Sequence, residues 1–175
     1  MIKDCRENIV DLKKAFSSVF SKNDPFDKMF VPTISSKIIV YPTNGYHLSK
    51  KQFLSLMGTI KEFGETSFYL SEIEGNSFEK MDTIAEHQHC ELHCGISYNE
   101  YEKKMIIFEN ALYSPSGKWG VIISHEDHAV IGSDKEFIQV FKKLYPNWID
   151  DQKKFLQNIQ YWNKFSSADI SWLPA

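Results

Sequence analysis

The sequence predicts an α+β fold, in which helices pack on an antiparallel sheet that is largely a meander. Three observations lead to this class. The stretch from Ala111 to Gly132 alternates apolar with small or polar residues and contains two turns, a pattern typical of consecutive antiparallel strands. Apolar residues recur at three- and four-residue steps near both ends of the chain, as on one face of a helix. One strand–helix–strand unit, residues 37–73, precedes the meander.

Length and composition favour one soluble domain over residues 1–175. Hydrophobic residues make up 42% of the chain and aromatic residues 14%, enough for a packed core. The net charge of −3 and lysines that cluster only in pairs argue against a nucleic-acid partner. No apolar run suits a signal peptide or a membrane span, and three cysteines suit reduced thiols. We therefore expect a cytoplasmic protein with no membrane partner.

The N-terminal half begins with a helix over residues 2–22, which Pro25 ends. The loop that follows carries Phe26, Met29 and Phe30, which we expect to fold onto the core or onto a partner. A β-branched run over residues 37–41 predicts a strand, and Thr66–Ile73 predicts another. Between them lies a predicted helix, Leu48–Phe63, with Ser49 as its N-cap, Gly64 just past its end, and an inward row of Phe53, Leu56, Met57 and Ile60.

Between this unit and the meander, Glu86–Tyr98 and Lys104–Phe108 are interpreted as strands, with Tyr98–Tyr101 connecting them. Within the meander, Ser114–Gly117 has turn chemistry, and Trp119, Val121 and Ile123 share one apolar face.

Two helices are predicted after the meander. A capping box of Ser133 and Glu136 begins the first, and Asp150 or Asp151 begins the second. The second helix is expected to turn Phe155, Ile159 and Trp162 inward. The tail Ser166–Ala175 is expected to pack on the body through Ile170, Trp172 and Leu173.

The segment Glu86–Cys94 is the most suggestive candidate for a metal site. As a strand it places Cys90, Leu92, Cys94 and Ile96 on one face, and His87, His89, Glu91 and His93 on the other. Two histidines two residues apart on a strand can share a metal, with a carboxylate between them. The spacing matches no zinc signature, so we predict no bound metal and keep this set as the alternative.

The turn His125-Glu126-Asp127-His128 offers acid–base groups between two strands, where sites are often found. A plain polar turn explains it equally well. Cys90 or Cys94 as a nucleophile is disfavoured by the apolar face that both occupy. The chain has no Gly-rich phosphate loop, C-x-x-C or H-E-x-x-H motif, so no cofactor is expected.

Aromatic residues are numerous enough to supply a protein interface as well as a core. Tyr and Trp concentrate at protein–protein contacts, and acidic residues join them when the partner is basic. We expect exposed aromatic residues around Tyr98–Tyr101 and Tyr113–Trp119. The residues predicted to bind a partner are Tyr98, Glu100, Tyr101, Tyr113, His125, Glu126 and Asp127.

The residues Ala111–Ser124, followed by His128–Gly132 and then Phe137 and Phe141, resemble a pattern found in small uncharacterised bacterial proteins of the toxin-immunity type. The resemblance covers about residues 111–141. It implies a cytosolic protein that binds and neutralises a toxin. These families share no catalytic motif, so the resemblance assigns no functional residue.

Two functions therefore compete. The first is a non-catalytic, cytoplasmic protein-binding domain whose partner is another protein, with a neutralised toxin as one candidate. The alternative is a small metal-dependent or His/acid-based hydrolytic enzyme that uses the His87–His93 strand together with the His125–His128 turn. The lack of a nucleophile motif or a metal signature favours binding, and the sequence leaves the oligomeric state open.

Overall fold

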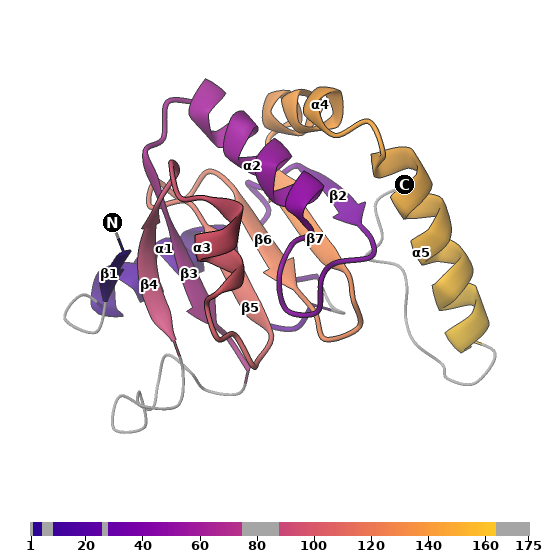
Figure 1. Ribbon diagram of the computed structural model, residues 1–175, viewed down its shortest axis with the longest axis horizontal. Helices are drawn as coiled ribbons and strands as arrows, with labels where there is room; N and C mark the ends of the chain where they lie inside the picture. Colours follow the sequence, from indigo (N-terminus) through magenta and orange to yellow (C-terminus); the bar gives the residue numbers. More distant parts are fainter. Residues whose placement is uncertain (1, 5–8, 26–27, 75–87, 164–175) are drawn as a thin grey trace.

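The computed structural model describes residues 2–4, 9–25, 28–74 and 88–163 of the chain (Figure 1). These residues form seven strands and five helices. In chain order they are β1 (Ile2–Asp4), α1 (Ile9–Val19), β2 (Ser36–Val40), α2 (Lys50–Glu62), β3 (Ser67–Glu72), β4 (His89–His93), α3 (Tyr98–Glu102), β5 (Asn110–Tyr113), β6 (Gly120–Ile123), β7 (Ala129–Ser133), α4 (Lys135–Leu144) and α5 (Trp148–Asn163).

All seven strands belong to one sheet with the order β1-β4-β3-β5-β6-β7-β2, and every neighbouring pair is antiparallel. The predicted α+β class is confirmed. The stretch Ala111–Gly132 forms the meander β5-β6-β7, in which Leu112 pairs with Val121 and Ile122 pairs with Val130. This meander occupies the middle of the sheet.

The predicted strand–helix–strand unit is present as β2, α2 and β3. β2 lies at one edge of the sheet, and β7, β6 and β5 separate it from β3. Four antiparallel steps restore the strand direction, so β2 and β3 point the same way without touching. Helix α2 therefore crosses one face of the intervening strands (Figure 1).

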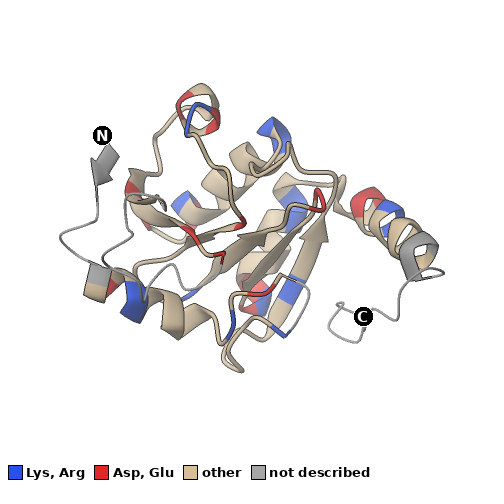
Figure 2. Ribbon diagram, turned by 90° about the horizontal axis from the view of Figure 1, so that it is seen from below, with Lys and Arg blue, Asp and Glu red and all other residues tan. Residues whose placement is uncertain are grey.

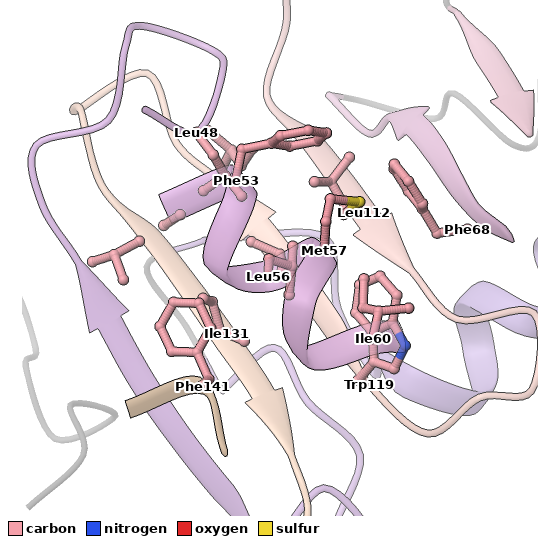
Figure 3. Packing of buried hydrophobic residues seen from close by; sticks show 14 of the residues in the cluster. Leu48, Phe53, Leu56, Met57, Ile60, Phe68, Leu112, Trp119, Ile131 and Phe141 are labelled. Carbon is pink, nitrogen blue, oxygen red and sulfur yellow. The ribbon is translucent and has the colours of Figure 1, made fainter. Parts of the chain in front are cut away.

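Each face of the sheet has its own hydrophobic core, because successive residues of a strand point to opposite faces. Ile38, Val121 and Ile123 belong to a core that α2, α3 and α4 cover. Leu112 and Ile131 lie against α2 in the same core (Figure 3). Ile39 and Ile122 point into a second core beneath α1 and the segment 28–34. The buried α2 residues include the predicted inward row Phe53, Leu56, Met57 and Ile60.

The predicted helix over residues 2–22 is wrong in its first part. Helix α1 covers Ile9–Val19, and Ile2–Asp4 is a strand that pairs with β4. The N-terminal residues thus complete the ladder of a strand that is far away in the sequence. Met29 and Phe30 are buried as expected, and Phe26 lies outside the described residues.

The predicted strand Lys104–Phe108 is also wrong. The segment before it is the short helix α3, which starts with a capping box formed by Ser97 and Glu100. At residue 107 the backbone N–H donates to a side chain, the carboxylate of Glu72, at 3.0 Å. Of the other expected strand here, Glu86–Tyr98, the described part forms β4 over His89–His93.

The expected starts of the last two helices shift as well. Asp134, not Ser133, is the N-cap of α4, and its side chain accepts a hydrogen bond from the Phe137 N–H at 2.8 Å. Ser133 belongs to β7 and donates to the Lys118 carbonyl at 2.9 Å. Helix α5 begins at Trp148, ahead of both predicted aspartates.

In α5, Phe155 is buried and Ile159 packs against the second core, as predicted. The side chain of Trp162 lies outside the described residues, as does the tail Ser166–Ala175 with Ile170, Trp172 and Leu173.

Candidate functional site

Three of the predicted partner-binding residues are buried tyrosines. Tyr98, Tyr101 and Tyr113 are 9%, 0% and 0% exposed, so the expectation that they form an exposed patch is wrong. Tyr101 stacks on Phe53 with ring centroids 4.4 Å apart, and its hydroxyl accepts from the Leu48 N–H at 3.1 Å. Tyr98 and Tyr101 are in the first core because α3 packs against Phe53 of α2, whereas Tyr113 is a β5 residue in the second core.

Glu100 is exposed on the first turn of α3, where its carboxylate serves the helix. It accepts hydrogen bonds from the Ser97 N–H at 3.0 Å and from the Ser97 hydroxyl at 2.6 Å. These hydrogen bonds lower the pKa of Glu100. The Glu100 carboxylate is therefore already engaged at the start of the helix.

The turn between β6 and β7 exposes His125, Glu126 and Asp127, and its backbone is held at several points. The Ser124 hydroxyl accepts from the Glu126 N–H at 3.0 Å. The Asp127 carbonyl accepts from the Thr43 N–H at 2.8 Å, which ties the turn to the segment after β2. Asp127 has a φ of 55°, a left-handed conformation that Asp and Asn tolerate better than most residues.

Carboxylates surround the His125 ring. Nδ1 of His125 lies 2.7 Å from Oε1 of Glu109, and Nε2 lies 3.5 Å from Oε1 of Glu126. The hydrogen bond with Glu109 raises the pKa of His125, and the charges of Glu109, Glu126 and Glu74 raise it further. We call these five residues, His125, Glu126, Asp127, Glu109 and Glu74, the acidic surface.

His128 does not join this surface, although it belongs to the same predicted cluster. Its side chain is fully buried, and its ring lies 4.8 Å from that of Phe155 on α5. Burial lowers the pKa of His128 to about 4, so the ring is neutral at neutral pH. The predicted group of four residues is thus divided between surface and core.

The residues of the alternative metal site lie in different environments. His89 is buried, while Glu91 accepts a hydrogen bond from the Ser67 hydroxyl at 2.7 Å. His93 is exposed and accepts from the Gly95 N–H at 2.9 Å, and His87 lies outside the described residues. Among the residues that the structure describes, no three His, Cys, Asp or Glu side chains are grouped to hold a metal ion.

The opposite face of β4 is apolar, as the sequence predicts. Cys90 and Cys94 are buried in the first core. Burial raises the pKa of Cys94 to about 11, which disfavours the thiolate that a nucleophile requires.

The two groups invoked for an enzyme, on β4 and on the β6–β7 turn, reach the same end of the sheet but do not meet there. β3 and β5 lie between β4 and β6. Three strand spacings separate them by about 14 Å, too far for a shared reacting atom. The described residues of the two groups therefore do not form a combined acid–base site.

The sequence interpretation missed the segment Lys104–Glu109, which lies beside the acidic surface. Met105 and Ile107 on this segment are 76% and 58% exposed. The continuous apolar run Met105–Phe108 suggested a strand there. The Ile107 N–H donates to Glu72, a residue 35 positions away, and not to a neighbouring strand. Such a partner leaves no local signal.

No described helix is both long enough and apolar enough to cross a bilayer. Comparison of the chain with protein-family models, with curated proteins and with solved structures gives no match.

Proposed function

We propose that this protein is a non-catalytic domain that binds another protein through the acidic surface. The proposal keeps the exposed members of the predicted site, His125, Glu126 and Asp127. It omits the three buried tyrosines and does not depend on Glu100, whose carboxylate caps α3. Figure 2 views the end of the sheet where this surface lies, with Asp and Glu residues on several of the loops.

The observation that supports the proposal is that the turn is exposed and yet held in one conformation. Thr43 fixes its backbone from one side, and Glu109 fixes the His125 ring from the other. Binding costs free energy when it orders loops and side chains. A turn that is already ordered presents its carboxylates at a smaller cost.

A neutralised toxin is the partner that we propose, and the cytoplasm is the proposed location. The resemblance of residues 111–141 to toxin-immunity proteins supports both. An immunity protein needs a stable complementary surface and no catalytic group, and an acidic turn suits a partner with a basic active-site region.

We expect reversal of the charge at Glu126 and removal of the charge at Asp127 to weaken the complex about tenfold or more, because electrostatic complementarity would be lost. The test variant combines Glu126→Lys with Asp127→Asn; asparagine is chosen because it tolerates the left-handed backbone at 127. The full chain is used to capture proteins from extracts of its source organism. The captured protein is identified by mass spectrometry, purified, and titrated against both forms by calorimetry.

Glu62→Lys is the matched control, because Glu62 is exposed at the end of α2, away from the β6–β7 turn. It should leave the affinity within about twofold. The proposal is overturned if no protein is captured and the chain hydrolyses a substrate in a way that His125→Ala abolishes. Equal affinities for the turn variant and Glu62→Lys would also contradict it.

A further inference from the structure

The segment Lys104–Glu109 displays an apolar pair at the edge of the acidic surface. Met105 and Ile107 are largely exposed, while Ile106 between them is 6% exposed and packs in the first core. Single exposed apolar residues are common on protein surfaces. Here two large ones project from one segment whose middle residue is anchored in the core.

Hydrogen bonds to Gln88 and to the buried Glu72 hold this segment on both sides of Ile106. The side-chain amide of Gln88 donates to the Met105 carbonyl. The Ile107 N–H donates to Oε1 of Glu72 at 3.0 Å, and Oε2 of Glu72 accepts from the Gln88 N–H at 2.7 Å. Glu72 is fully buried. The apolar pair therefore stands on a fixed backbone, as expected for a contact that binds with a small entropic cost.

The apolar pair is continuous with carboxylates. Glu109 lies two residues after Ile107, and its Oε1 lies 2.7 Å from Nδ1 of His125. The Glu109 carbonyl accepts a hydrogen bond from the Ile73 N–H at 2.8 Å. Glu74 follows Ile73, and its charge acts on His125 together with that of Glu126. An apolar centre with a polar rim is the usual anatomy of a protein interface. Here the carboxylates lie on the Ile107 side of the pair, and Lys103 and Lys104 precede Met105.

We propose that the partner docks a basic segment here, with an aliphatic or aromatic side chain on Met105 and Ile107 and with Lys or Arg residues facing the exposed Glu74 and Glu126. This inference rests on the proposed function, because it assigns the partner chemistry of the same surface. The carboxylates beside the apolar pair favour a basic segment as the partner, because charge complementarity selects the partner. Insertion of the apolar pair into a membrane is disfavoured, since anionic lipids would face these carboxylates.

Selection from a random dodecapeptide library on phage, with the immobilised full chain as target, tests the proposal. We expect enriched peptides to combine at least two Lys or Arg residues with a large apolar residue. A synthetic copy should bind the wild type, measured by fluorescence anisotropy. It should bind about tenfold more weakly to the double variant Met105→Ser, Ile107→Ser. Binding of the peptide to the wild type should also weaken as the salt concentration increases.

Leu54→Ser is the matched control, because Leu54 is an apolar residue of α2 that is 52% exposed. It should leave peptide binding unchanged. The inference fails if no peptide is enriched, if the enriched peptides lack basic residues, or if Met105→Ser, Ile107→Ser has no effect. It also fails if phosphatidylserine vesicles bind the chain and the same double variant abolishes that binding.

The two proposals fail in different ways. If a captured partner responds to Glu126→Lys with Asp127→Asn but not to the Met105 and Ile107 variant, the binding function stands and the basic docking segment is wrong. If peptides bind at the apolar pair but the chain captures no protein and hydrolyses a substrate in a way that His125→Ala abolishes, the docking chemistry stands and the proposed function fails.

Discussion

Two glycines that face each other across β6 and β7 shape the second core. Gly120 pairs with Gly132 in the ladder. A Cβ on Gly120 would lie 2.4 Å from the Phe20 ring, and a Cβ on Gly132 would lie 2.5 Å from the Phe30 ring. The two rings lie 5.2 Å apart. The bare backbone of the glycine pair thus makes room for a pair of phenylalanines.

Gly120→Ala and Gly132→Ala should each lower the free energy of unfolding by about 1–3 kcal/mol, because overpacking displaces buried rings. Urea unfolding followed by circular dichroism measures the effect. Gly58→Ala on α2 is the control. Its new Cβ meets only the end of the Leu144 side chain, which is 39% exposed, and alanine favours the helix by about 1 kcal/mol. Unchanged stability in Gly120→Ala would contradict the packing argument.

Buried or half-buried carboxylates connect elements that the chain order separates. Glu65, after α2, accepts hydrogen bonds from the hydroxyls of Ser114 and Ser116 at 2.5 and 2.6 Å and from the indole N–H of Trp119 at 2.8 Å. It thereby fixes the β5–β6 turn. Glu72 does the same at the other end of the sheet, where it holds Gln88 and Ile107.

Glu72→Gln should destabilise the fold by about 1–3 kcal/mol. Both oxygens of Glu72 accept backbone N–H groups, and a glutamine amide can accept only one of them while its NH₂ faces the other. Hydrogen exchange by NMR should show faster exchange at the Ile107 or Gln88 amide than in the wild type. Exchange rates that match the wild type at both amides would show that the carboxylate does not hold the segment.

Helix α5 is attached to the edge strand β2 by a few specific contacts. Asp151, 5% exposed, accepts from the Tyr41 N–H at 3.1 Å and from the Tyr145 hydroxyl at 2.7 Å. Phe155 packs between Tyr41 and His128, with ring centroids 5.9 and 4.8 Å away. The attachment of α5 therefore includes a buried titratable ring.

The whole molecule should lose stability in mild acid through His128. Its pKa falls from 6.5 to about 4 on burial, so the unfolded chain binds a proton that the folded chain does not between these values. Stability from this group is present above about pH 6.5 and decreases as the pH falls towards 4. Between about pH 7.5 and about pH 5 the loss should be about 2 kcal/mol.

Urea unfolding at both pH values measures this loss. His128→Phe keeps an aromatic ring against Phe155 without a titratable group. Between the two pH values, the free energy of unfolding of this variant should therefore fall by about 2 kcal/mol less than that of the wild type. An identical pH dependence in the wild type and His128→Phe would exclude His128 as the cause.

The sequence by itself determined the fold class, the meander at Ala111–Gly132 and the inward face of α2. Each depends on a local period of apolar residues, which the backbone geometry converts directly into a face. The chemistry of the β6–β7 turn, with an exposed His125 and acidic neighbours, was also predictable, because polar residues at a turn remain at the surface.

Only the tertiary structure decided which strands are neighbours, which tyrosines are buried and where apolar residues are exposed. β1 is a strand because its backbone pairs with that of β4. Tyr101 is a core residue because α3 packs on Phe53. Met105 and Ile107 are exposed on a segment between β4 and β5 whose backbone binds Glu72. Each of these outcomes depends on a contact between residues far apart in the chain, and local periodicity carries no information about such a contact.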